Sequence, residues 1–186
     1  MKIFISGGCK NGKSFFAQRL AKEQSLTHAH NADGKPCPLY YIATMNPVDT
    51  EDNERIARHR KERENWGFIT IEQPSDIEKI LDVCSSNGSF LLDSLTALLA
   101  NEMFFPDNKI NEKASEKISQ GLLRVMNTVK NIVIVSDYIY SDALIYDPLT
   151  EKYRKSLAET DRGAALNCDT VLEISHTNVI VHKGRI

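Results

Sequence analysis

Short apolar runs alternate along the chain with longer stretches in which apolar residues recur every three or four positions. The short runs suit buried strands, and the longer stretches suit amphipathic helices packed on a core. Strands are predicted at residues 2–6, 39–43, 68–71, 89–93 and 132–135, and a terminal hairpin at 170–174 and 179–182. This alternation indicates an α/β fold with a mostly parallel sheet, helices on both faces and an antiparallel C-terminal edge.

Start signals and the spacing of apolar residues predict further helices. Ser75-Asp76-Ile77-Glu78 matches a capping box, in which the serine and glutamate side chains satisfy backbone N–H groups at a helix start. Longer helices are predicted at residues 111–129 and at about 149–165. The length of the chain suits one hydrophobic core, so residues 1–186 are expected to form a single domain.

The first strand leads into Gly7-Gly8-Cys9-Lys10-Asn11-Gly12-Lys13-Ser14, which matches the phosphate-loop pattern G-x-x-x-x-G-K-[ST]. A predicted strand before the loop and a predicted helix after it provide the context that the motif requires. The glycines let backbone N–H groups point at phosphate oxygens, and the helix N-terminus adds partial positive charge. Lys13 is expected to reach the β- and γ-phosphates, and Ser14 to bind Mg²⁺. The loop predicts a three-layer P-loop NTPase fold of the RecA-like kind.

A predicted helix at residues 51–65 is polar on nearly every face, with Ile56 and Ala57 as its apolar members. Burial of a core face cannot hold such a helix, so it is either a solvated, ion-paired spacer or a functional surface. A spacing of four residues aligns one stripe of side chains: Glu51, Arg55, His59 and Arg63. A histidine among arginines suits an anionic phosphate partner, and both interpretations stay open at this point.

The apolar run at residues 89–93 ends in Asp93, as a Walker B strand ends in an acid. A carboxylate at that place orients Mg²⁺, directly or through water. The alternative is an aspartate that only caps the following helix, which carries Leu95, Leu98 and Leu99 at helical spacing.

The charge balance limits the classes of partner. Lys and Arg total 23 against 25 for Asp and Glu, so no global basic field would attract nucleic acid. No run of about 18 apolar residues occurs, and the first apolar run enters the phosphate loop at once, so neither a membrane span nor a signal peptide is predicted. We therefore expect a cytoplasmic protein. The 4 cysteines lack C-x-x-C spacing, which argues against a zinc ribbon or a disulfide scaffold.

Several motifs, taken in order, match a known family. They are the phosphate loop, Tyr41-Ile42-Ala43-Thr44, Asp49, Glu51, Arg55-Ile56, His59-Arg60, Trp66, Ile71-Glu72 and Leu91-Leu92-Asp93-x-Leu95-Thr96. On these residues the chain resembles the bifunctional adenosylcobinamide kinase/adenosylcobinamide-phosphate guanylyltransferases of cobalamin biosynthesis. The array from Thr44 to His59 has fixed internal spacing and is more specific than the phosphate loop alone.

The resemblance implies two reactions in one site. In the first, the γ-phosphate of a nucleoside triphosphate, ATP or GTP, moves to the aminopropanol hydroxyl of adenosylcobinamide. In the second, His59 attacks the α-phosphate of GTP, and the GMP that it holds passes to the new phosphate to give adenosylcobinamide-GDP. A neutral imidazole is a competent nucleophile near neutral pH. The family forms homotrimers, which implies a homo-oligomer here.

The same resemblance gives each candidate residue an expected role. The catalytic residues are His59, Lys13 and Asp93, and the Mg²⁺ ligands are Ser14 and Asp93. Nucleotide-binding residues besides the glycine loop are Arg55, Arg58, Arg60 and Glu72. Arginines near the histidine can balance charge on the α-phosphate. The candidates for substrate contact or for the base of the kinase step are Thr44, Asp49 and Glu51. By residue type alone Asp137 is a further candidate for the base, ranked after Asp49 and Glu51, since a carboxylate can take the proton of the acceptor hydroxyl.

The later part of the chain departs from the family pattern. After the strand at 132–135 the family has Asn-Glu-Val-Gly, where this chain has Ser136-Asp137-Tyr138-Ile139. Asp161-Arg162 stands where Asn-Gln is expected, although Tyr153-Arg154 matches an expected aromatic-Arg pair. Two alternatives stay open: another P-loop small-molecule kinase with His59 on a solvated helix, and a non-catalytic regulatory homologue that only binds nucleotide.

Overall fold

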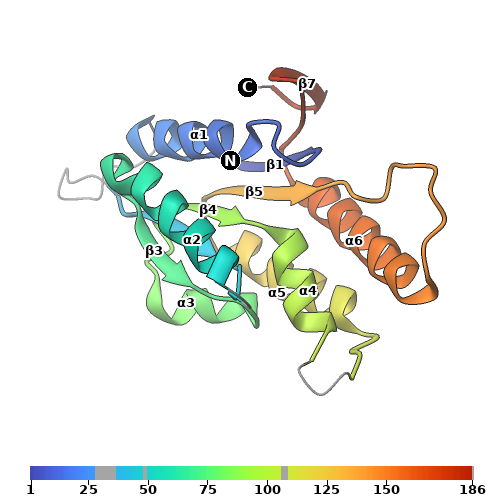
Figure 1. Ribbon diagram of the computed structural model, residues 1–186. Helices are drawn as coiled ribbons and strands as arrows, with labels where there is room; N and C mark the ends of the chain where they lie inside the picture. Colours follow the sequence, from blue (N-terminus) through green and yellow to red (C-terminus); the bar gives the residue numbers. More distant parts are fainter. Residues whose placement is uncertain (28–36, 48–49, 106–108, 186) are drawn as a thin grey trace.

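The computed structural model describes residues 1–27, 37–47, 50–105 and 109–185, and within one helix (residues 50–63) it describes only some of the side chains. Its strands form one seven-stranded sheet in the order β3-β2-β4-β5-β1-β6-β7 (Figure 1). The strands are β1 Lys2–Gly7, β2 Leu39–Ala43, β3 Ile69–Glu72, β4 Ser89–Asp93, β5 Asn131–Asp137, β6 Thr170–Ser175 and β7 Asn178–Lys183. All neighbours pair in parallel except β6 and β7, which confirms the predicted sheet.

Helices cover both faces of the sheet (Figure 1). They are α1 Lys13–Thr27, α2 Thr50–Arg63, α3 Ile80–Val83, α4 Leu95–Met103, α5 Ala114–Thr128 and α6 Pro148–Asn167, with short 3₁₀ turns η1 Glu64–Trp66 and η2 Ile77–Lys79. The α1 helix packs on one face, and α3, α4, α5 and α6 pack on the other. Among the described residues, no helix has both the length and the apolar character needed to span a bilayer.

The central strands are apolar without interruption because each of their faces meets a helical layer. Along β4, Leu91 belongs to the core beneath α1, whereas Phe90 and Leu92 belong to the core on the opposite face. Strand β5 alternates in the same way. A one-residue slip would exchange the two sets of side chains between differently shaped cores, so the register is strongly specified.

The C-terminal hairpin forms as predicted. Strands β6 and β7 are antiparallel, with Ser175 opposite Asn178. His176 and Thr177 make the two-residue turn with φ values of 50° and 68°. Positive φ at both central positions is the geometry of a type I′ turn, whose twist suits the flanking strands.

The capping-box prediction at residues 75–78 is wrong. Asp76 takes the N-cap position with φ of 49°, its side chain makes no cap hydrogen bond, and only the single turn η2 and the short α3 follow. A buried carboxylate decides this geometry, because the Asp76 backbone N–H donates to Glu102 Oε1 at 2.7 Å. Lys117 then bridges the Asp76 and Glu102 carboxylates at 2.5 and 2.7 Å. Tertiary hydrogen bonds thus replace the local cap.

Parallel pairing brings the ends of β4, β5 and β1 to one edge of the sheet. Gly7, the last residue of β1, lies opposite Asp137, the last residue of β5. Asp93, the last residue of β4, lies opposite Val135 of β5. The phosphate loop and two carboxylates therefore emerge side by side, at the edge where open α/β sheets bind ligands.

The two-faced core predicts the cost of removing a central side chain. Leu92 is 0% exposed and Leu166 of α6 is 72% exposed. Leu92→Ala should lower the free energy of unfolding by about 2–5 kcal/mol, because it leaves a cavity between the sheet and the helices. The matched Leu166→Ala should change it by less than about 0.5 kcal/mol. Urea denaturation of both variants checks this, and equal effects would contradict the burial described.

Candidate functional site

The phosphate loop turns tightly between β1 and α1. Lys10 and Gly12 have φ values of 55° and 89°, so the backbone passes through the left-handed region twice. At Gly7 a side chain is excluded, since a Cβ there would lie 2.5 Å from the Ile174 carbonyl oxygen. The Asn11 side chain braces the loop by accepting from the Lys13 N–H at 3.2 Å and donating to the Ile174 carbonyl. A braced loop of this kind holds N–H groups ready for an anion.

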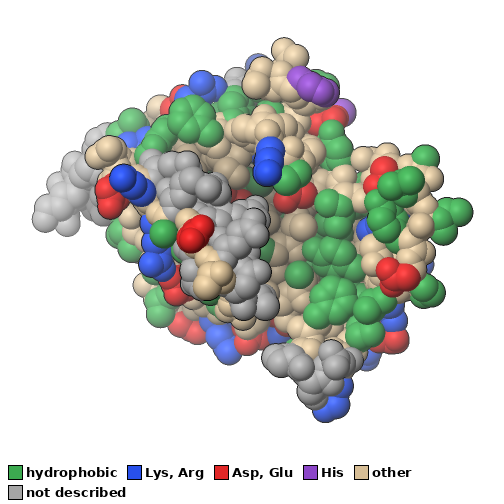
Figure 2. Space-filling view, viewed as in Figure 1, with side chains coloured by type: hydrophobic (Ala, Val, Ile, Leu, Met, Phe, Trp, Pro, Cys, Tyr) green, Lys and Arg blue, Asp and Glu red, His purple; other side chains and the backbone are tan. Residues whose placement is uncertain are grey.

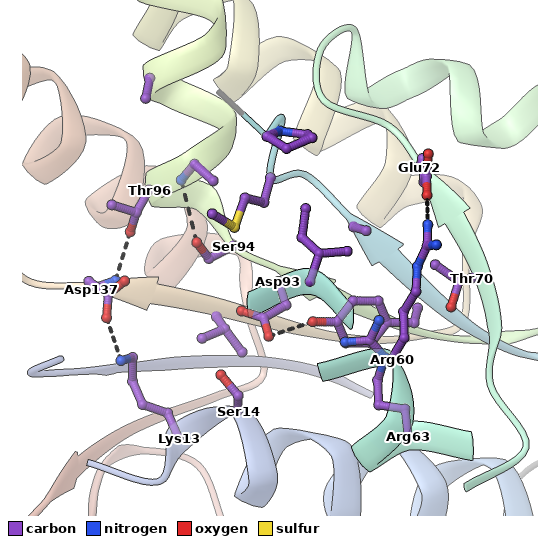
Figure 3. Close-up of a pocket in the computed structure, with 18 of the residues that line it drawn as sticks. Lys13, Ser14, Arg60, Arg63, Thr70, Glu72, Asp93, Ser94, Thr96 and Asp137 are labelled. Carbon is purple, nitrogen blue, oxygen red and sulfur yellow. Dashed lines mark hydrogen bonds and ion pairs between the residues drawn. The ribbon is translucent and has the colours of Figure 1, made fainter. Parts of the chain in front are cut away.

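Lys13 lies at the bottom of the loop with only 6% of its surface exposed. Its ammonium donates to the Gly8 carbonyl at 3.0 Å and forms an ion pair with Asp137 Oδ1 (Figure 3). The Asp137 backbone N–H donates in turn to Thr96 Oγ1 at 2.9 Å. The cation predicted to bind phosphates therefore faces a carboxylate at the end of β5.

Asp93 points into the same space from the end of β4 (Figure 3). Its Oδ2 accepts a hydrogen bond from the Tyr41 hydroxyl at 2.8 Å. Burial, together with the negative charge of Asp93, raises the pKa of Tyr41 well above its usual value, so the tyrosine stays a donor. The Arg63 guanidinium lies 3.6 Å from the centre of the Tyr41 ring, which is cation–π geometry. One tyrosine thus links the predicted metal ligand to an arginine of α2.

These groups line one cavity of about 1090 Å³. Its walls come from the phosphate loop, the ends of β2, β4 and β5, and the side of α2 that carries Ile56, Ala57, Arg60 and Arg63. Arg60 forms an ion pair with Glu72 at the end of β3, away from Lys13 (Figure 3). The polar helix therefore lines the same cavity as the phosphate loop, which favours the functional interpretation of its charges over a solvated spacer.

Two of the lining residues suit Mg²⁺. Ser14 offers a hydroxyl and Asp93 a carboxylate, the hard oxygen donors that this ion prefers. Within the described ranges, no three His, Cys, Asp or Glu side chains are grouped to hold a metal. That donor set suits an ion that keeps several waters and is completed by substrate phosphates. Bound there, Mg²⁺ would neutralise charge on the phosphate oxygens.

Some predicted residues lie outside the cavity or outside the described part of the chain. Thr44 is fully buried, and its hydroxyl donates to the Ser94 carbonyl and accepts from the Ser94 N–H, both at 2.8 Å. It holds the turn after Asp93 and does not line the cavity. Asp49 is outside the described residues. The helix backbone includes four more candidates whose side chains are not described: Glu51, Arg55, Arg58 and His59.

The sequence model of the cobinamide kinase/cobinamide phosphate guanyltransferase family matches residues 3–178. The chain belongs to this family. A curated relative, the bifunctional adenosylcobalamin biosynthesis protein CobP of Pseudomonas aeruginosa, is 28% identical over 173 residues, covering 92% of this chain and 91% of its own. The CobU protein of Escherichia coli, with the same bifunctional description, is 29% identical over 106 residues, covering 56% of this chain and 51% of its own.

Solved structures support the same architecture. The flagellar accessory protein FlaH of Methanocaldococcus jannaschii superposes with a TM-score of 0.51 at 15% identity, covering 98% of this chain and 78% of its own. A KaiC-like protein of Pyrococcus horikoshii superposes with a TM-score of 0.55 at 12% identity, covering 99% of this chain and 79% of its own. At this identity the likeness concerns the fold alone, and it confirms the predicted P-loop NTPase fold for this member of the cobinamide kinase family.

Sequence reasoning left several lining residues of this family member without a role. Arg63 had a signal, because it falls on the predicted stripe one turn after His59. Tyr41 appeared only as part of a motif. Thr96 and Tyr153 come together across the fold, where the Tyr153 hydroxyl donates to the Thr96 carbonyl at 2.8 Å. No spacing rule relates residues so far apart in sequence, so only the structure could join them.

Behind the cavity wall lies a buried acid, Asp161 of α6. It is 3% exposed, its Oδ2 accepts from the Tyr140 hydroxyl at 2.9 Å, and its Oδ1 has no hydrogen-bond partner within the described residues. Burial raises the pKa of Asp161 to about 7, an effect that the Ser136 and Tyr140 hydroxyls partly offset and the charge of Asp137 adds to. The folded protein therefore holds a proton on this carboxyl below neutral pH.

The raised pKa of Asp161 predicts pH-dependent stability. An unfolded aspartate ionises near 3.8 but the folded one only near 7, so between these values the unfolded chain binds fewer protons and stability falls as pH rises. The Asp161→Asn variant lacks this loss. Its free energy of unfolding relative to wild type should increase between pH 4 and pH 8 by something on the order of 2–4 kcal/mol. Denaturation at a series of pH values measures it.

The control for this experiment is on the same helix. Glu159 of α6 is exposed, so Glu159→Gln should keep the wild-type dependence of stability on pH. An Asp161→Asn variant whose stability parallels that of the wild type across the range would contradict a protonated, buried carboxyl.

Proposed function

We propose that this protein performs both reactions of its family in the one cavity. It transfers a phosphoryl group from ATP or GTP to the aminopropanol hydroxyl of adenosylcobinamide, and then transfers GMP from GTP to that product through a histidine–GMP intermediate. The observation that carries the proposal is the meeting of two anion-binding elements. Lys13 of the phosphate loop and Arg60 and Arg63 of α2 line the same cavity.

The kinase reaction needs a held triphosphate and compensation of its charge. The loop N–H groups and Lys13 provide the first, and Mg²⁺ held by Ser14 and Asp93 would supply the second. The acceptor oxygen attacks the γ-phosphorus, the bond to the β-phosphate oxygen breaks, and the nucleoside diphosphate leaves. The contacts of Lys13 support this role, because its ammonium has three donors and here meets two acceptors that a phosphate oxygen can join or displace.

The guanylyl transfer needs a nucleophile beside cationic groups. Helical spacing puts position 59 next to the side of α2 defined by Ile56, Arg60 and Arg63, which borders the cavity. An imidazole nitrogen of His59 forms a bond to the α-phosphorus of GTP, and pyrophosphate leaves. A phosphate oxygen of the acceptor then attacks the same phosphorus and releases the histidine. Arg60 and Arg63 are the described donors that can stabilise charge at this phosphorus.

A large, partly apolar acceptor suits the loop between β5 and α6. The exposed apolar side chains there are Ile139, Leu144, Ile145 and Tyr146. Arg154 of α6 holds the loop, donating to the Ile139 carbonyl at 3.1 Å and to Asp142 at 2.8 Å. Figure 2 shows hydrophobic side chains gathered over this part of the surface. A corrinoid offers matching apolar area, which supports its assignment as acceptor.

We further propose a cytoplasmic homotrimer, following the family resemblance. Sedimentation equilibrium of the nucleotide-free protein tests the assembly, and a monomer at micromolar concentration would contradict it.

The histidine intermediate predicts a covalent adduct. Wild-type protein incubated with GTP and Mg²⁺ should gain the mass of GMP, because the phosphoramidate forms before the acceptor arrives. The adduct should be labile in acid and stable in base, and His59→Ala should abolish it. Intact-protein mass spectrometry measures this directly. The matched control is His182→Ala, since His182 lies on the terminal hairpin and bonds to Glu173 there.

The outcome also separates the alternatives. If no adduct forms but acceptor phosphorylation persists and Lys13→Ala abolishes it, the protein is a P-loop small-molecule kinase. If GTP binds tightly and neither phosphate nor pyrophosphate is released over hours, it is a regulatory homologue. An adduct that survives in His59→Ala would show that another residue is the nucleophile.

A further inference from the structure

Within the described residues, three carboxylates line the cavity, namely Glu72, Asp93 and Asp137. Each comes from the end of a different strand, and each has different partners. A carboxylate that acts as general base must lie near the transferred phosphoryl group and be free to accept a proton. Their contacts distinguish them.

Two of the carboxylates are committed to other partners. Glu72 forms an ion pair with Arg60, on the α2 side of the cavity and away from Lys13 (Figure 3). Asp93 accepts from the buried Tyr41 hydroxyl and stands at the Walker B position suited to Mg²⁺. A carboxylate engaged by a metal is a poor proton acceptor, because the cation stabilises its ionised form.

Asp137 is also in an ion pair, but its partner is the lysine of the phosphate loop, and within the described residues one of its two carboxylate oxygens stays open. Its Oδ1 pairs with Lys13, and its Oδ2 accepts no hydrogen bond from any described residue. The Asp137 side chain is 28% exposed, so a substrate can reach it. Its backbone is held by β5 opposite Gly7 and by the hydrogen bond to Thr96, which fixes the carboxylate beside the phosphate loop. The Asp137 carboxylate therefore contacts the same ammonium group that would bind a phosphate oxygen.

We propose that Asp137 is the catalytic base of the kinase reaction, an inference that rests on the proposed function. As the acceptor oxygen bonds to the γ-phosphorus, its proton moves to Asp137 Oδ2, and the bond between the γ-phosphorus and the β-phosphate oxygen breaks. Charge is conserved, since the carboxylate becomes neutral and the leaving diphosphate takes the electron pair. The proton is later released to water.

The position beside the loop between β5 and α6 agrees with this role. Tyr138 and Ile139 follow Asp137 directly and begin the segment with exposed apolar side chains. An acceptor lying on that segment would bring its hydroxyl towards Asp137 and the phosphate loop. The α2 arginines border the other side of the cavity, where the guanylyl step is proposed.

The first test compares Asp137→Asn with wild type in the kinase reaction. Asparagine keeps an oxygen for Lys13 to bond but cannot take a proton. We expect kcat for acceptor phosphorylation to fall by about 10²–10⁴-fold, the usual contribution of a general base. The Kd for Mg²⁺–nucleotide, measured with a fluorescent analogue, should change by less than about threefold because Lys13 stays in place. Asp137→Glu should restore part of kcat.

The second test is chemical rescue. Asp137→Ala leaves room for a small carboxylate, so added formate should restore kcat in proportion to its concentration, whereas Asp137→Asn should not respond. The comparison variant Asp93→Asn should behave differently. It should raise the Mg²⁺ concentration needed for activity and gain nothing from formate.

Two results would overturn the base assignment. One is an Asp137→Asn variant that keeps kcat within threefold of wild type. The other is a loss of kcat matched by an equal loss of nucleotide affinity and not rescued by formate, which would limit Asp137 to positioning Lys13. Wild-type protein that phosphorylates no acceptor and forms no GMP adduct would instead overturn the proposed function, and this assignment with it.

Discussion

Parallel pairing of β4, β5 and β1 is the constraint on which the site depends. Their register places Gly7 opposite Asp137 and Asp93 opposite Val135, so the loop and both carboxylates meet at one edge. Helices on both faces hold that register, because a shifted strand would move every core side chain to the wrong layer. The packing of the sheet therefore determines the spacing of the phosphate loop and the two carboxylates.

The site also depends on a helix that contributes little to the core. Of the α2 side chains that the structure describes, only that of Arg63 is buried. The Arg63 guanidinium stacks on the Tyr41 ring, and Arg60 forms an ion pair with Glu72. These two contacts connect the helix to the sheet. These polar contacts leave two arginines, Arg60 and Arg63, on the wall of the cavity that the phosphate loop also lines. Polar side chains of α2 thus line the cavity, and the helix lacks the apolar face by which a helix ordinarily packs on a core.

Much of the fold could be predicted because its signals are local. Buried parallel strands read as apolar runs, the phosphate loop carries its own glycines, and the terminal hairpin follows from two apolar runs, 170–174 and 179–182, with a short polar segment between them. The prediction failed where a distant group intervened. At Asp76 the backbone N–H donates to the buried Glu102 carboxylate, and no local pattern predicts so distant a partner.

The sequence by itself determined the α/β architecture, the phosphate loop with Lys13 and Ser14, the acid at the end of β4 and the family. Only the tertiary structure decided the partners of these residues. Lys13 and Asp137 are 124 positions apart, and Tyr41 and Asp93 are 52 apart. Such contacts arise from strand order and register, which depend on how both faces of the sheet are buried together. Local sequence patterns identify the chemical groups, and packing decides which of them come into contact.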